Sequence, residues 1–309
     1  MSLLVSPNTW WVLLSMLILG IASGMIGCLA YWKRQSLMSD ALSHAALPGV
    51  VIAFALTGVK SLPVLIFGAA VSALLGALLV QWVVAYSRIK EDSAMGIVLS
   101  VFFGLGIMLL TMVNRTGGGN VSGLDGFIFG QAASMVRSDV YTMSGLGLLV
   151  IALVGIAFKE WKLFLFDPQF AKGLGLWNRT MNVLYTAVLV LVIVIGIQAV
   201  GVILMSALLI IPSVSARYWT HSFGWMLIWA AVVGGGSGVA GTLISTMGKG
   251  WPTGPFIVVC SAAVFTVSLL FGARKGLVIT AIQQRSEKSS SLRRAALERE
   301  KPLREGEWG

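Results

Sequence analysis

The sequence predicts an all-α protein that crosses a membrane about eight or nine times. Of its 309 residues, 57% are hydrophobic and only 11% are charged. A water-soluble domain carries about 25% charged residues. Several apolar runs of 18 or more residues follow one another, and each is long enough to span a bilayer as a helix. A water-soluble fold is therefore disfavoured.

Nine apolar segments are expected to be membrane-spanning helices. In chain order they are approximately 10–32, 38–58, 62–86, 93–114, 139–158, 180–199, 201–217, 224–246 and 254–273. The two segments that meet at Val200-Gly201 can count as one span or two, which gives the range of eight to nine. Residues 1–276 are expected to form the transmembrane domain, and 277–309 a charged cytoplasmic tail.

The distribution of positive charge predicts the orientation of the chain. The net charge is +10, but nine of the 22 Lys and Arg residues lie from Arg274 onward and most others lie between apolar runs. With the N-terminus outside, 18 of the 22 fall on the inner side, as the positive-inside rule requires. This pattern explains the basic composition without nucleic-acid binding and predicts a cytoplasmic C-terminus.

Several chemistries are excluded by missing motifs. Cys28 and Cys260 lie in separate apolar runs without CxxC spacing, so neither a disulfide nor a zinc site is indicated. No P-loop is present, because Gly248-Lys249 is followed by Gly250. The chain therefore cannot hydrolyse ATP through a P-loop of its own. No HExxH or GxSxG motif occurs either.

One polar stretch stands out, Ser36-Leu-Met-Ser-Asp-Ala-Leu-Ser-His-Ala-Ala-Leu-Pro-Gly49. Apart from Asp139, which is the first residue of its span beside the outer loop, Asp40 is the only acidic residue in a predicted span, where a charge at mid-bilayer costs about 2.5–3.5 kcal/mol. His44 lies one turn further on the same helix face, with the Cβ atoms roughly 6 Å apart. Such a pair can hold one divalent cation. Pro48 leaves the carbonyl of His44 without its helical partner and is expected to bend the helix.

The sequence leaves two interpretations of this pair open. Asp40 can cap the second helix near the inner surface, with His44 as a buried imidazole whose hydrogen bonds are satisfied. Alternatively both are metal ligands, which the polar stripe of Ser36, Asp40, Ser43 and His44 favours. Manganese and zinc need at least four donors. A metal site would therefore require a second chain that presents the same face across a twofold axis.

Two further stretches carry information. In the inner loop Lys159–Gly175, Asp167-Pro168 is a strong helix start, and Gly173 and Gly175 are natural helix ends. We expect a short amphipathic helix there that either lies on the membrane or docks into a soluble partner. In the span after Gly201, Pro212 frees the carbonyl of Leu208 and hydroxyl groups lie nearby, which is typical of a kinked packing helix or of a pathway lining.

Small residues recur at helical spacing in two places. Gly20, Gly24 and Gly27 form one stripe, and Gly234–Gly238 with Gly241 form another. Stripes of this kind let transmembrane helices approach closely, so they predict helix packing.

Four stretches occur in order along the chain: Ser36–Gly49, Gly123–Ala133, Phe166–Ala171 and Leu208–Arg217. Together they resemble the membrane permease of bacterial ABC importers for manganese, zinc or iron, and the resemblance covers roughly residues 10–273. It implies that Asp40 and His44 match the metal-coordinating pair of the permeation path. It also implies that the segment after Leu165 matches the coupling helix that docks on the ATPase, with Phe166, Asp167, Pro168, Phe170, Ala171 and Gly175.

The resemblance further implies a set of partners. They are a second permease chain, identical or related, two ATP-hydrolysing subunits on the cytoplasmic side, and an extracytoplasmic metal-binding protein. The chain itself would be a non-enzymatic transport subunit in a bacterial plasma membrane, in contact with lipid and without a tightly bound cofactor. The Gly123–Ala133 stretch and Pro48 are closer to the manganese and iron branch than to the dedicated zinc branch.

The expected function is import of manganese(II) through Asp40/His44 pairs, with helix movement at Pro48-Gly49 and at Pro212. Zinc or iron import by the same family is the alternative. A less favoured alternative is an ATP-independent transporter or channel in which Asp40 relays a proton or cation. An intramembrane hydrolase using Ser43 and His44 is disfavoured, because adjacent helix positions point about 100° apart.

Overall fold

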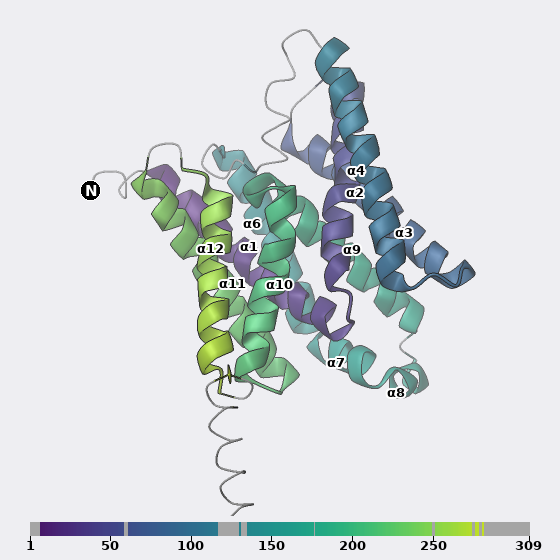
Figure 1. Ribbon diagram of the computed structural model, residues 1–309, viewed down its shortest axis with the longest axis vertical. Helices are drawn as coiled ribbons and strands as arrows, with labels where there is room; N and C mark the ends of the chain where they lie inside the picture. The colour runs from purple at the N-terminus through teal and green to yellow at the C-terminus, as the bar shows by residue number, and fades with distance from the viewer. Residues whose placement is uncertain are drawn as a thin grey trace, which may run out of the picture.

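The structure is a computed structural model that describes residues 7–58, 61–116, 130, 135–175, 177–248, 251–273, 276, 277 and 280. Within these ranges every regular element is helical (Figure 1). The helices are α1 (Pro7–Trp32), α2 (Ser36–Thr57), α3 (Leu62–Tyr86), α4 (Glu91–Thr116), α6 (Arg137–Ile156), α7 (Phe158–Phe166), α8 (Pro168–Gly173), α9 (Asn178–Val200), α10 (Val202–Trp219), α11 (Phe223–Met247) and α12 (Thr253–Phe271).

All nine predicted spans are present as helices, with ends within three residues of the expected positions. In the described ranges eight helices are long and apolar enough to cross a membrane, and the apolar part of α10, Leu204–Trp219, is shorter. The all-α polytopic fold class is therefore confirmed. The predicted tail lies outside the described residues apart from Leu277 and Thr280, as does the Gly123–Ala133 stretch apart from Gly130.

The uncertain pair of spans is resolved as two helices that meet inside the protein. Val200 is fully buried, and Gly201 adopts φ 96° and ψ 161°, a conformation that side chains rarely allow. Two other glycines lie against this corner: a Cβ added at Gly130 would lie 2.4 Å from the carbonyl carbon of Val200, and one added at Gly254 would lie 2.5 Å from its carbonyl oxygen. The chain therefore reverses between α9 and α10 within the packed core.

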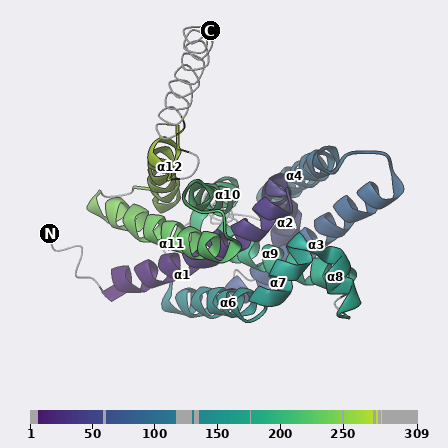
Figure 2. The same cartoon turned by 90° about the horizontal axis from the view of Figure 1, so that it is seen from below.

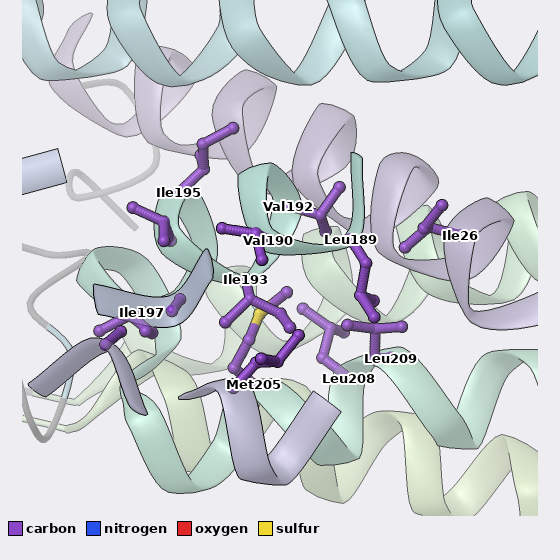
Figure 3. Packing of buried hydrophobic residues seen from close by; sticks show 14 of the residues in the cluster. Ile26, Leu189, Val190, Val192, Ile193, Ile195, Ile197, Met205, Leu208 and Leu209 are labelled. Atoms are coloured by element: carbon purple, nitrogen blue, oxygen red, sulfur yellow. The ribbon is translucent and has the colours of Figure 1, made fainter. Parts of the chain in front are cut away.

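The apolar core surrounds α9 and α10. Figure 3 shows side chains of α9 such as Leu189 and Ile193 packed against Met205, Leu208 and Leu209 of α10. All five side chains are buried. A helix that is apolar on every side belongs in the interior of a bundle, which is where α9 lies (Figure 2).

On one side of this core α1 and α11 are packed backbone to backbone (Figure 2). A Cβ added at Gly20 would lie 2.2 Å from the carbonyl oxygen of Gly234, and one at Gly24 would lie 2.3 Å from that of Ala230. Gly27 instead faces α10, where a Cβ would lie 2.0 Å from the oxygen of Leu209. The predicted close packing at the glycine stripes is confirmed.

On the other side α2, α3 and α4 form a group of three helices (Figures 1 and 2). A Cβ added at Gly49 would lie 2.0 Å from the carbonyl oxygen of Gly68, so α2 and α3 touch through their backbones. The Ser72 hydroxyl of α3 donates to the carbonyl oxygen of Ala45 on α2 at 2.6 Å. Gly106 of α4 lies against Pro48. The helix that carries Asp40 and His44 is therefore fixed by both of its neighbours.

The corner between α1 and α2 is a Schellman helix end. The N–H of Gln35 donates to the carbonyl of Ala30 at 3.0 Å, and the N–H of Arg34 donates to that of Tyr31 at 3.1 Å. Arg34 occupies the left-handed position, with φ 59°, where glycine is usual. The corner thus sets the point at which α2 begins.

Candidate metal site

Asp40 and His44 lie on one face of α2, as their spacing predicts. The Oδ1 atom of Asp40 is 3.7 Å from Nε2 of His44. The Asp40 side chain is 37% exposed and that of His44 is 14% exposed. The carboxylate therefore points out of this chain from a membrane-spanning helix, and the imidazole lies deeper beside it.

The capping interpretation of this pair is wrong. Helix α2 begins at Ser36, its N-cap is Gln35, and no side chain makes a capping hydrogen bond there. Asp40 is the fifth residue of the helix, past the positions whose N–H groups need a cap. The Nδ1 atom of His44 is buried without a hydrogen-bond partner among the described residues, so the imidazole is not satisfied either.

Two serines beside the pair donate their hydroxyl protons within α2. The Ser43 hydroxyl donates to the carbonyl oxygen of Ser39 at 2.8 Å, and the Ser39 hydroxyl donates to that of Ser36 at 2.9 Å. Their hydroxyl protons are therefore used within α2. Among the stripe residues, the Asp40 carboxylate and the His44 imidazole are the groups that bind divalent transition metals most readily.

A residue that the sequence analysis did not select completes the surroundings of the imidazole. The ring of Phe103 on α4 lies edge-on to His44, with centroids 4.8 Å apart and planes at 80°. This contact, together with Asp40, fixes the plane of the imidazole. No sequence signal could have revealed it, because Phe103 is one of many apolar residues on a lipid-compatible helix.

Asp40 and His44 are placed so that both could bind one ion, but two ligands do not complete a metal site. Two donors about 2.1 Å from a tetrahedral ion lie about 3.4 Å apart, close to the 3.7 Å between Asp40 and His44. Among the described residues no group of three or more His, Cys, Asp or Glu side chains could hold a metal. Further donors would have to come from outside this part of the chain.

The predicted short helix exists as α8, but it is preceded by a helix that was not predicted. Asp167 caps α8, because its Oδ1 atom accepts from the N–H of Phe170 at 3.0 Å, and Pro168 is the first helical residue. The chain then turns at Gly175, with φ 83°. The additional helix α7 follows α6 after a break at Ala157, and its Trp161 is fully buried.

The residues predicted to contact the ATPase differ in how much of each side chain is exposed. Ala171 is buried, whereas Phe166 and Phe170 are 48% and 56% exposed. Phe166 also contacts the protein, since its ring centroid lies 4.7 Å from that of Trp32 at the end of α1. Figure 1 places α7 and α8 at the end of the molecule where α12 finishes.

The proline positions have different surroundings. Helix α2 runs unbroken through Pro48 and Gly49, in contact with α3 and α4. Pro212 lies inside α10, and the hydroxyls of Ser213 and Ser215 donate to carbonyls of their own helix, at 2.8 Å in both cases. These serines are buried. The surroundings of α10 are thus those of a packing helix.

A family model described as the ABC 3 transport family matches residues 6–272. The chain belongs to this family. This ABC 3 family chain is 50% identical to the manganese transport system membrane protein MntC of Bacillus subtilis over 277 residues, which are 90% of the chain but 64% of MntC. It therefore spans less than two thirds of that relative. It is 43% identical to the zinc transport system membrane protein TroC of Treponema pallidum, covering 86% of the chain and 90% of TroC.

A solved structure supports the same assignment. PsaBC from Streptococcus pneumoniae in complex with Fab matches with a TM-score of 0.78 and 30% identity, covering 89% of this chain and 95% of the solved one. The resemblance of the four sequence motifs to permeases of bacterial ABC importers is thereby confirmed. This ABC 3 family chain is a multi-pass permease of a bacterial plasma membrane.

Proposed function

We propose that this chain is the permease subunit of an ATP-driven importer of manganese(II). Its relative in Bacillus subtilis, 50% identical, is named for manganese transport. The relative in Treponema pallidum is named for zinc, so zinc is the competing cargo. A carboxylate oxygen paired with an imidazole nitrogen suits either ion, since oxygen donors favour manganese and nitrogen donors favour zinc.

The observation that supports this function most strongly is the Asp40/His44 pair. A carboxylate that is 37% exposed on a membrane-spanning helix would be costly against lipid. It becomes favourable where it faces an ion and a second chain. Two copies related by a twofold axis would supply two carboxylates and two imidazoles, which is a complete donor set for one ion.

The proposed transport cycle uses three partners. An extracytoplasmic binding protein delivers the metal to the outer mouth, and the two Asp40/His44 pairs receive it. ATPase subunits dock on the α7–α8 segment, where Phe170 and Leu174 are exposed large apolar side chains. ATP binding and hydrolysis then open the inner side, with movement of α2 near Pro48 and Gly49 and of α10 near Pro212.

Replacement of the ligand pair tests this function. In cells that express the whole importer, Asp40→Ala and His44→Ala should each reduce manganese uptake to background, because each removes one donor per chain. Uptake of radioactive manganese, alone and with competing zinc or iron, measures both the activity and the cargo. Ser43→Ala is the matched control, since its hydroxyl is bonded within its own helix.

The amount of assembled complex, measured by co-purification of the ATPase, should be unchanged in all three variants. Normal uptake by Asp40→Ala or His44→Ala would refute the site. Stronger competition by zinc than by manganese itself would reassign the cargo to zinc.

A further inference from the structure

A lysine is enclosed at the corner between α1 and α2. The Lys33 ammonium donates to the Oδ1 atom of Asn182 on α9. It also lies over two aromatic rings, 4.2 Å from the centroid of Tyr185 on α9 and 5.3 Å from that of Phe164 on α7. Both distances are within the range of cation–π attraction. A single charged side chain therefore joins the end of α1 to both α7 and α9.

Burial of the Lys33 ammonium disfavours its charged form. Burial lowers the pKa of Lys33 to about 8, although the Glu91 carboxylate acts in the opposite direction and raises it. The ammonium is still mostly charged at neutral pH. Desolvation of the ammonium therefore offsets part of what its contacts contribute to stability, and a well-packed apolar side chain could be as stable at this place.

The corner that Lys33 occupies determines the start of the ligand helix. Lys33 is three residues before Ser36, the first residue of α2. The side-chain amide of Gln35, in the same corner, donates to Oε1 of Glu91 in the first turn of α4. A displacement of the corner would therefore be transmitted to α2 and to α4, the two helices that present His44 and Phe103.

The aromatic side chains that contact Lys33 and Trp32 from α7 belong to the segment on which the ATPase is proposed to dock. Phe164 and Phe166 belong to α7, and α8 follows directly. Phe166 packs on Trp32, the residue before Lys33, with ring centroids 4.7 Å apart. Helix α7 is held to the bundle by the buried Trp161. A movement of α7 thus reaches the corner through two adjacent side chains, Trp32 and Lys33.

We propose that Lys33 is a positioning residue that couples the ATPase-facing helix α7 to the metal-ligand helix α2. Its ammonium is held between Phe164 on one side and Asn182 and Tyr185 on the other, so the start of α2 follows α7. The inference rests on the proposed function, because it assigns α7–α8 to the ATPase and α2 to the metal. The charge is essential: a neutral side chain of similar length fills the space but is attracted neither to the amide oxygen nor to the ring faces.

The test uses the complete importer, co-purified with its ATPase and reconstituted in proteoliposomes. ATP hydrolysis and manganese uptake are measured together for Lys33→Met, Lys33→Arg and the wild type. Lys33→Met should lower the manganese imported per ATP about tenfold while ATP hydrolysis continues. Lys33→Arg, which keeps the charge and the ring contacts, should restore most of the ratio. Lys90→Met, at an exposed lysine of another inner segment, should leave it unchanged.

Two further measurements separate positioning from a structural role. Without nucleotide, the manganese affinity of the detergent-solubilised Lys33→Met complex should stay within about twofold of the wild-type affinity. The thermal stability of Lys33→Met should equal or exceed that of the wild type. Asn182→Leu should reproduce the loss of coupling.

The inference is overturned if Lys33→Met imports as much manganese per ATP as the wild type. It is also overturned if stability, metal binding and hydrolysis all fall together in that variant. A wild-type complex that hydrolyses ATP without moving any metal would instead refute the proposed function.

Discussion

At the scale of single residues, Phe103 and Asp40 together set the orientation of the His44 imidazole. The ring contact at 4.8 Å comes from another helix, and the buried Nδ1 atom of His44 has no partner among the described residues that would hold the ring in its place. A ligand that is free to rotate loses entropy when it binds a metal. Residues that orient metal ligands therefore contribute to affinity although they do not touch the ion.

Phe103→Leu should therefore weaken manganese binding about tenfold, because the imidazole gains rotational freedom while both ligands remain. Equilibrium dialysis of manganese against the purified complex measures the change in affinity. Val101→Leu, at an exposed site on the same helix, is the control and should bind as the wild type does. Unchanged affinity in Phe103→Leu would show that Asp40 alone orients the imidazole.

At this scale the ligand pair could be predicted from the sequence, whereas the residues that surround it could not. Asp40 and His44 could be predicted because their spacing is local: four residues on a helix define a shared face without knowledge of the fold. Phe103 and the partners of Lys33 could not, because Asn182 lies 149 positions from Lys33 and meets it only after the bundle has assembled. In the sequence Lys33 is one more positive charge on the inner side.

At the scale of the helix end, Arg34 occupies a position that favours glycine. A side chain in the left-handed region costs about 1 kcal/mol relative to glycine. Arg34→Gly should therefore raise the midpoint of thermal unfolding of the detergent-solubilised protein by a few degrees. Arg34→Ala removes the charge but keeps the backbone strain, so it should show no gain. Equal effects of the two substitutions would assign the change to charge instead.

At the scale of the helix pair, α1 and α11 have no room for a side chain at their crossing. A Cβ at Gly234 would lie 2.1 Å from the carbonyl oxygen of Gly20, whereas one at Gly236 would meet nothing within 4 Å. Gly234→Ala should thus destabilise the protein by about 1–3 kcal/mol, and Gly236→Ala should be tolerated. Thermal unfolding of the two variants side by side is the measurement. A tolerated Gly234→Ala would mean that the helices can separate at no cost.

Helix positions were predicted well because the apolar runs are long, but short helices between them were not. Helix α7 has nine residues, and its sequence mixes charges with aromatic residues, which is also typical of a loop on the inner surface. It becomes helical because Trp161 and Phe166 pack on the bundle. That packing is tertiary, so no window of the sequence contains it.

At the scale of the whole molecule, the charge distribution predicts which end faces the cytoplasm. In a Cys260→Ser background, a cysteine at Ser222 should be protected from a membrane-impermeant thiol reagent in intact cells, and one at Ser138 should be labelled. Both positions are exposed on the protein, and Cys28 is buried. The reverse labelling pattern would invert the topology and with it the assignment of α7–α8 to the ATPase side.

The contact of α2 with α3 through Gly49 and Gly68, secured by the hydrogen bond from Ser72, has a consequence for motion. A helix whose backbone touches its neighbour cannot slide past it without breaking that contact, so α2 and α3 move together, and α4 is packed against them where Gly106 meets Pro48. A displacement of α2 near Pro48 and Gly49 is then a displacement of this group of helices against α1 and α11.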